Sequence, residues 1–360
     1  MTTPTIPSTR RIGYLDSIRG MAALAVVIFH SNAWLDFTKD TNFNSSIPTH
    51  ILNIFFNGHN AVCLFFVLSG FVLSLKYVKK NDIQEVSYVE FILKRIFRLY
   101  PAYWFVLIIA ALYTSADSVV FFQELPLLIF GNNTLIPPSW SLIAEMRMSL
   151  IFLFLLVLAM RNVKLLFVAA FLFWFLFGFR VYVLHFCLGI LLAMNFDKIQ
   201  QLELSKAKRY VLFFIGFLLC SFEQIHFIIV PHENFKATNT ELGFFLGAFG
   251  CVIWLVLAMS APKFQKRIET KPLLFLGDIS YGLYIGHWLI FVNILEPHFE
   301  WFLSKIGSFY LTHIIVRYGL VIPLSLLFAT FLYYVIEKPF IKWGYNIAKK
   351  YKDKLVLKLN

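Results

Sequence analysis

Charged residues are scarce in this chain, and their scarcity excludes several classes of protein. Asp, Glu, Lys and Arg make up 14% of the 360 residues, against about 25% in typical soluble domains. Hydrophobic residues reach 59%, which rules out a disordered chain and a soluble α/β enzyme. The apolar runs are continuous rather than alternating, so they do not fit a porin-like barrel. The composition instead predicts a polytopic membrane protein.

Motifs for several chemistries are also missing. The chain has no Walker loop, no G-x-G-x-x-G and no H-E-x-x-H sequence. Its four cysteines lie singly in apolar runs, so we interpret them as small buried hydrophobes. We therefore expect no metal site and no disulfide framework. The net charge of +12 is interpreted as a topology signal rather than as a sign of nucleic-acid binding.

Ten apolar segments are long enough to be membrane-spanning helices. They cover 14–33, 59–77, 99–115, 139–159, 163–179, 181–195, 210–230, 242–260, 274–295 and 312–335. With the N-terminus inside, 25 of the 32 basic residues fall on the cytoplasmic side and four on the other. This asymmetry predicts an all-α protein of ten transmembrane helices with both termini cytoplasmic.

We divide the chain into a transmembrane domain, residues 1–340, and a basic cytoplasmic tail, residues 341–360. The sequence Glu337-Lys338-Pro339 is expected to form an inner ion pair and to stop the last helix. In the second span, Ser69 and Gly70 are small residues that let helices approach closely.

Polar side chains within apolar spans are costly and are therefore candidates for function. Arg19 and His30 are eleven residues apart, so on a helix they share a face, separated by roughly 16 Å along the axis. They could line a pathway through the protein. Alternatively, Arg19 extends to the inner headgroups and His30 caps the outer end.

Three further groups leave similar alternatives. Arg95 and Arg98 are one turn apart and could bind phosphates, or could only anchor the inner end of their helix. Glu145 could orient a hydroxyl or a histidine, or could form a structural ion pair with Arg147 or Arg317. His287 is a candidate catalyst or a hydrogen-bonded core histidine.

Several motifs together resemble the membrane acyltransferase 3 family, whose bacterial members modify surface glycans. The matching sequences are Tyr14-Leu15-Asp16-Ser17-Ile18-Arg19-Gly20 with His30, Phe65-Phe66-Val67-Leu68-Ser69-Gly70-Phe71, Arg95-x-x-Arg98-Leu-Tyr-Pro, Trp140-Ser141-Leu142-x-x-Glu145, Ile279-Ser280-Tyr281-Gly282-Leu283-Tyr284-x-x-His287-Trp288 and Glu337-Lys338-Pro339-Phe340. Each motif is weak by itself, but their order and spacing span residues 14–340. We do not expect the esterase-like domain that some members carry.

The resemblance implies an O-acyltransferase, with acetyl as the expected group, in the bacterial inner (cytoplasmic) membrane. Acetyl-CoA from the cytoplasm would be the donor, and a surface polysaccharide such as lipopolysaccharide O-antigen the acceptor. The other expected partners are membrane lipids, with no nucleic acid and no metal.

The resemblance also implies roles for individual residues. His30 would be catalytic, as general base or as acyl carrier, with help from Glu145. Arg19, Arg95 and Arg98 would hold the cofactor. The residues expected to contact the acceptor are Trp140, Ser141 and His287.

A transporter or flippase of a lipid-linked glycan or small solute is the alternative function. It would also need polar residues in the membrane, but the chain shows no inverted repeat. The outer loops 34–58 and 116–138 are rich in polar and aromatic residues, and we expect them to face the glycan.

Overall fold

The computed structural model describes residues 12–33, 52–80, 87–126, 134–177, 182–229, 237–307 and 309–359. Over these ranges the regular structure is entirely helical. A lipid environment explains this choice, because a helix satisfies its backbone hydrogen bonds within one segment.

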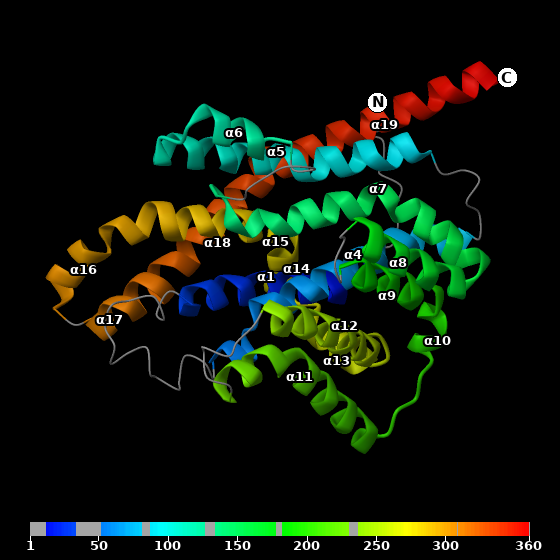
Figure 1. The fold of residues 1–360 in the computed structure, drawn as a ribbon, viewed down its shortest axis with the longest axis horizontal. Helices are drawn as coiled ribbons and strands as arrows, with labels where there is room; N and C mark the ends of the chain where they lie inside the picture. The colour runs from blue at the N-terminus through cyan, green and yellow to red at the C-terminus, as the bar shows by residue number, and fades with distance from the viewer. Residues whose placement is uncertain are drawn as a thin grey trace.

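The helices of the first half are α1 (Gly13–Ala33), α4 (Gly58–Lys80), α5 (Tyr88–Thr114), α6 (Ser118–Glu124), η2 (Pro137–Ser139), α7 (Trp140–Arg161), α8 (Val163–Phe177), α9 (Tyr182–Met194) and α10 (Phe196–Gln200). Those of the second half are α11 (Lys206–Ile229), α12 (Ala237–Met259), α13 (Pro262–Ile268), α14 (Lys271–Asp278), α15 (Ser280–Trp288), η4 (Leu289–Leu295), η5 (Glu296–His298), α16 (Phe299–Ile306), α17 (Phe309–His313), η6 (Ile314–Val321), α18 (Ile322–Phe331), η7 (Leu332–Glu337) and α19 (Lys338–Leu359). In Figure 1, α16 and α17 lie at one end of the long axis, and α10 and the end of α19 lie towards the other.

Each of the ten expected spans corresponds to a helix or a helical run. In the described part of the chain, five helices are long and apolar enough to cross a membrane, and a sixth span results if one bent pair is counted together. The five are Leu52–Val78, Tyr88–Thr114, Pro137–Arg161, Glu241–Met259 and Leu311–Tyr351. The fold is therefore that of a multi-pass membrane protein, while the count of ten stays a prediction.

Two of the expected helices differ from the prediction. The ninth, 274–295, is broken at Ile279, where Lys271–Asp278 and Ser280–Ile306 meet at 60°. The tenth does not stop at Pro339, because the helix continues through α19. Pro339 lacks a backbone N–H to bond to the preceding turn, and the helix accommodates it directly after the π-helical turns of η7.

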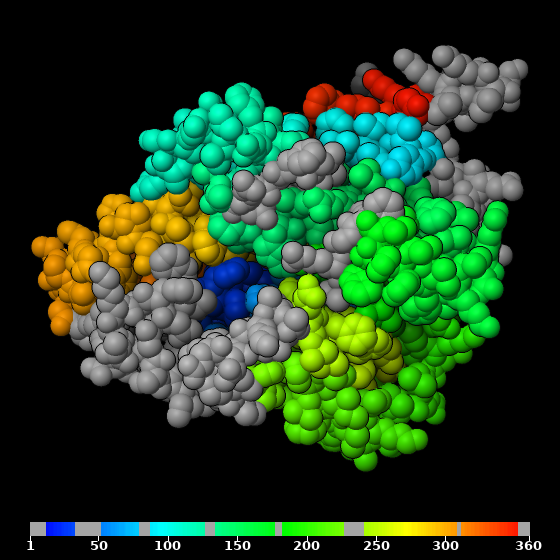
Figure 2. Space-filling view, viewed as in Figure 1, coloured from blue at the N-terminus to red at the C-terminus, as the bar shows by residue number. Residues whose placement is uncertain are grey.

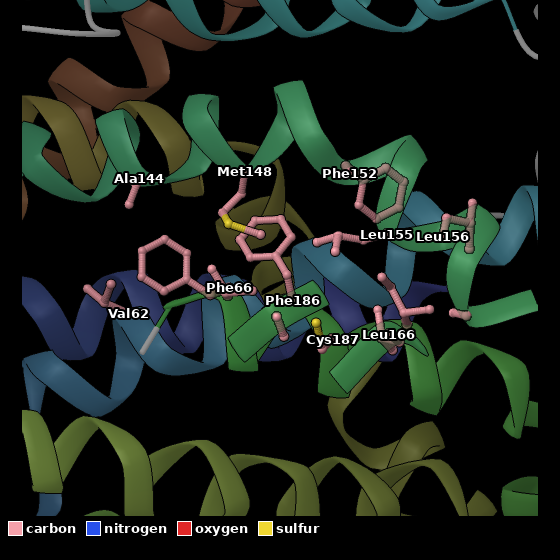
Figure 3. Packing of buried hydrophobic residues seen from close by; sticks show 14 of the residues in the cluster. Val62, Phe66, Ala144, Met148, Phe152, Leu155, Leu156, Leu166, Phe186 and Cys187 are labelled. Atoms are coloured by element: carbon pink, nitrogen blue, oxygen red, sulfur yellow. The ribbon is translucent and has the colours of Figure 1, made fainter. Parts of the chain in front are cut away.

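A large apolar cluster joins α4, α7 and α9. Figure 3 shows Phe66 of α4 and Phe186 of α9 packed beneath Ala144, Met148 and Phe152 of α7. All five side chains are buried, so this cluster fixes how the three helices are rotated about their axes.

The helices α4 and α9 touch at their backbones. A Cβ atom on Gly70 would lie 2.4 Å from the carbonyl oxygen of Phe186, too close for any side chain. The expected close approach at Ser69 and Gly70 is therefore present.

The helix α1 lies in the middle of the molecule. It packs against α4 on one side and against α14, α15 and η6 on the others, as its position among these helices in Figure 1 shows. A polar residue on α1 is therefore surrounded by protein.

Candidate active site

Two histidines from α1 and α15 form the centre of the site. Nδ1 of His30 lies 2.9 Å from Nε2 of His287. Their ring planes lie within 13° of each other, with centroids 5.1 Å apart. The ring of Trp288 contacts His30 edge-on at 5.5 Å. His287 is fully buried, whereas His30 is only partly buried, so a reactant can reach His30 and not His287.

The partners of His287 decide which nitrogens carry protons. Its Nδ1 lies 2.7 Å from the carbonyl oxygen of Tyr284 and 3.2 Å from that of Leu283. A carbonyl oxygen only accepts hydrogen bonds, so this nitrogen is the donor. In the neutral ring, Nε2 of His287 must then accept, and Nδ1 of His30 donates to it. Nε2 of His30 keeps its lone pair, as a general base requires.

Arg19, at the other end of α1, contacts the same helical run. Its guanidinium donates to the side chain of Ser280 at 3.0 Å and to the carbonyl of Gly277 at 3.1 Å, and it pairs with Asp16 at 2.8 Å. The Arg19 end of the polar face of α1 is thus held by residues beside the break at Ile279, and the His30 end by His287 near the C-terminal end of α15. Arg19 and His30 therefore share one face that is turned towards the protein interior.

The third and fourth spans contribute an ion pair. Arg95 of α5 donates to Glu145 of α7 and to the hydroxyl of Ser149 at 3.1 Å. Glu145 also accepts from Ser69 of α4 at 3.3 Å. The partner of Glu145 is therefore Arg95, not the Arg147 or Arg317 suggested by the sequence. The reason is that α5 packs against α7, which the sequence does not reveal.

The three candidate arginines lie near one another. Arg98 is exposed, and it is close enough to Arg19 and Arg95, and to the carboxylates of Glu145 and Glu337, to interact with them electrostatically. Arg95 is buried and paired with Glu145. The structure thus gathers the three predicted cofactor-binding residues into one basic cluster, of which Arg98 is the exposed member.

Of the three residues expected to contact the acceptor, His287 belongs to the histidine pair and Ser141 is connected to it through Tyr284. The hydroxyl of Ser141 donates to the phenol oxygen of Tyr284 at 2.7 Å, and the carbonyl of Tyr284 holds His287. Trp140 does not join this network. Its ring packs against Tyr182 and Phe244 at centroid distances of 5.6 and 5.9 Å. Glu145 makes no hydrogen bond to His30 either.

The spacing of residues in the ninth span indicates from sequence alone that His287 lies on a polar helix face. Ser280, Tyr284 and His287 are separated by four and three residues, so they occupy one face of a helix. That face meets the Arg19–His30 face of α1. The hydrogen bond of His59 with Glu223 at 2.7 Å had no such signal, because the two residues lie on separate helices.

The surface around the site is recessed. In the space-filling view α1 is visible at the centre of the face, set back between α7, α12 and the run from η4 to α16 (Figure 2). The outer loops expected to face the glycan can be followed only in part, because 34–51 and 127–133 lie outside the described residues. Among the residues that are described, no group of three or more His, Cys, Asp or Glu side chains could hold a metal ion.

Comparison with known proteins gives a consistent result. Residues 12–336 match the family model of an acyltransferase domain, acyltransferase 3. Two relatives in Staphylococcus aureus, both named O-acetyltransferase OatA, are 24% identical over 94% of this chain, one from strain NCTC 8325 and one from strain COL. The chain covers 58% of the length of each.

No solved structure is significantly similar. The family match extends over nine tenths of the chain and contains His30, His287 and the three arginines. The chain therefore belongs to the membrane acyltransferase 3 family, whose model describes an acyltransferase domain.

Proposed function

We propose that this protein is an O-acetyltransferase of the bacterial cytoplasmic membrane. It would take acetyl from cytoplasmic acetyl-CoA and transfer it to a hydroxyl of a surface polysaccharide such as lipopolysaccharide O-antigen. The named relatives are O-acetyltransferases, which supports the reaction. Ten spans would place both termini, including the tail 341–360, in the cytoplasm. Donor and acceptor would then bind on opposite faces of the membrane.

The hydrogen bond between His30 and His287 is the observation that carries this proposal. It leaves Nε2 unprotonated on His30, a residue that is only partly buried. A transporter would need polar groups along its pathway, but it has no need for an imidazole held in one tautomer by a second imidazole. We therefore favour the enzyme.

In the proposed reaction Nε2 of His30 takes the proton of the acceptor hydroxyl. The oxygen attacks the thioester carbonyl and forms the ester bond, the carbon–sulfur bond breaks, and the CoA thiolate takes the proton back from His30. His287 holds the His30 ring by accepting a hydrogen bond from its Nδ1–H, and this hydrogen bond stabilises the imidazolium formed in between. A covalent acyl-His30 intermediate is the competing route.

The arginines would hold the donor. CoA carries several phosphate charges, and Arg98 is the exposed member of the basic cluster. Arg19 and Arg95 would add positive charge next to Arg98. We propose that Glu145 acts by fixing Arg95, since it lies in contact with Arg95 and not with His30.

The test is an assay of polysaccharide O-acetylation in cells that express the wild type, His30→Ala or Arg19→Ala at matched levels, with His298→Ala as control. His298 is exposed, and its ring bonds to the backbone carbonyl of Ile294, one turn earlier in the same helical run. We expect both site variants to lose acetylation and the control to keep it. Normal acetylation in His30→Ala would refute the catalytic role. Retained flipping or uptake without acetyl transfer in any form of the protein would favour the transporter.

Trapping distinguishes the two chemical routes. Purified protein is mixed with radiolabelled acetyl-CoA in the absence of acceptor and quenched in acid. Direct transfer predicts no label on the protein, whereas label that disappears in His30→Ala would show the acyl-histidine route.

A further inference from the structure

A pair formed by a histidine and a carboxylate lies near His30, outside the hydrogen-bond network of His30 and His287. Nδ1 of His59, in the first turn of α4, is 2.7 Å from Oε2 of Glu223 on α11. The side chain of Glu223 is 7% exposed and that of His59 is 37% exposed. The carboxylate is therefore buried behind the ring, and the ring is open to a ligand.

The carboxylate determines which nitrogen of His59 is available. An ionised carboxylate only accepts hydrogen bonds, so Nδ1 of the ring donates to Glu223. Nε2 then keeps its lone pair when the ring is neutral. A ring that is oriented in this way by a carboxylate can accept a hydrogen bond from an alcohol.

The pair is fixed by tight packing. Asn57 and Asn60, on either side of His59, both donate to the backbone carbonyl of Cys220, the former at 3.3 Å. A Cβ atom on Gly243 of α12 would lie 2.9 Å from Cβ of Glu223. Only glycine lets α12 approach so closely, and the contact leaves Glu223 little room to move.

One phenylalanine connects the two histidine pairs. The ring centroid of Phe29 is 5.6 Å from that of His30 and 5.5 Å from that of His59. The accessible imidazoles of both pairs therefore contact the same side chain, next to the C-terminal end of α1.

Aromatic rings extend from His59 in the other direction. His59 stacks on Phe244 at 5.4 Å and 27°. Phe244 contacts the rings of Trp140 and Tyr182 edge-on, at 5.9 and 5.7 Å. Sugars bind where aromatic faces receive their C–H groups and a few fixed polar groups receive their hydroxyls.

We propose that His59 and Glu223 form a subsite for a sugar hydroxyl of the acceptor, with the partly buried rings of Trp140 and Tyr182 as its wall and the buried Phe244 behind them. Nε2 of His59 accepts a hydrogen bond from a hydroxyl other than the one acylated, which orients the sugar towards His30. Glu223 is a positioning residue that acts through His59. This inference deepens the proposed function and rests on it in one respect, that the acceptor is a carbohydrate.

The experiment uses the full chain in detergent micelles, which expose both faces. The probes are radiolabelled acetyl-CoA and an oligosaccharide prepared from the surface polysaccharide of the source bacterium and stripped of its esters by mild alkali. Three quantities are measured: hydrolysis of acetyl-CoA without oligosaccharide, transfer as a function of oligosaccharide concentration, and equilibrium binding of the oligosaccharide alone.

We expect His59→Gln and Glu223→Leu to raise the KM for the oligosaccharide and its Kd roughly tenfold, as loss of one good hydrogen bond to a fixed partner would. Hydrolysis of acetyl-CoA should stay within about twofold of the wild type, because His30 is intact. In the His59→Gln background, Glu223→Leu should have no further effect. The control His298→Gln should match the wild type.

Two outcomes would overturn the subsite. One is an unchanged KM and Kd for the oligosaccharide. The other is a parallel loss of hydrolysis, transfer and thermal stability in both variants, which would make the pair a purely structural link between α4 and α11. Failure of the proposed donor gives a different pattern, in which the wild type turns over no acetyl-CoA while the effect of His59→Gln on oligosaccharide binding remains.

Discussion

At the scale of single residues, the proposed chemistry depends on which imidazole nitrogen carries the proton. A free imidazole exchanges its two tautomers, so a base with one fixed tautomer needs a partner. Here the partner of His30 is a second histidine, whose own proton is fixed by the carbonyl of Tyr284. The base that we propose is therefore held in one tautomer by a chain of hydrogen bonds that starts at the backbone of α15.

Substitution of His287 tests this chain. His287→Ala should lower acetyl transfer by about 10- to 100-fold, because the ring of His30 then exchanges between its two tautomers although the base itself is still present. His287→Gln should recover part of the activity, because an amide oxygen can still accept from Nδ1 of His30. The measurement is kcat for acetyl transfer at saturating substrates. Equal losses in the two variants would argue that the second imidazole only fills space.

The pair of Arg95 and Glu145 poses a different problem, because both charges are largely removed from water. Their side chains are 8% and 19% exposed. Removal of one partner leaves the other charge uncompensated, at a cost of about 3–5 kcal/mol for fully buried pairs. This pair is partly exposed, so we expect a smaller loss.

We predict that Arg95→Met and Glu145→Gln each lower the thermal stability of the protein in detergent. The double variant should be more stable than the sum of the single effects implies, because neither charge is then left alone. Thermal unfolding of the four proteins gives the coupling directly. Strictly additive losses would show that the two side chains do not depend on each other.

At the scale of helices, the site is made by the contact of α1 with the broken ninth helical run. A Cβ atom on Gly20 would lie 2.5 Å from the backbone nitrogen of Gly277. The two helices can meet at this point only because neither carries a side chain there. This contact brings Arg19 to Ser280 and helps to set where His30 meets His287.

We therefore expect Gly20→Ala to reduce activity although it changes no polar residue. The methyl group collides with backbone, so α1 and α14 must separate and the hydrogen bonds at both ends of α1 lengthen. Gly319→Ala is the matched control, because nothing lies within 4 Å of a Cβ atom at that position. Acetyl transfer and protein yield are compared for both. An active Gly20→Ala protein would show that the helices can shift without harm.

At the scale of the whole molecule, the proposed reaction needs the two ends of the bundle to face different compartments. The basic residues predict the cytoplasmic side at α13 and the outer side at η5. The four native cysteines are buried, so a thiol introduced at either place can be labelled against a low background.

In intact cells, a membrane-impermeant thiol reagent should therefore label the protein with His298→Cys and not the protein with Lys266→Cys. Permeabilised cells should label both. Lys266 lies in the last turn of α13 and His298 ends η5, and both are exposed. The reverse pattern would invert the orientation, and with it the side on which acetyl-CoA binds.

The sequence by itself determined the class of the fold and the family. Long apolar runs must become helices in lipid, because no other single segment satisfies its own backbone there. The motif residues Arg19, His30, Arg95, Arg98, Glu145 and His287 stand at spacings that the sequence displays directly. Periodicity along one helix also placed Arg19 and His30 on a common face.

Only the tertiary structure decided which of these residues meet. The partner of His30 is His287, that of Glu145 is Arg95, and that of His59 is Glu223. Each pair joins two helices, and its contact depends on how far each helix is rotated and shifted within the bundle. Those positions come from packing over the whole molecule, from apolar clusters and from backbone contacts at glycine, which no single stretch of sequence records.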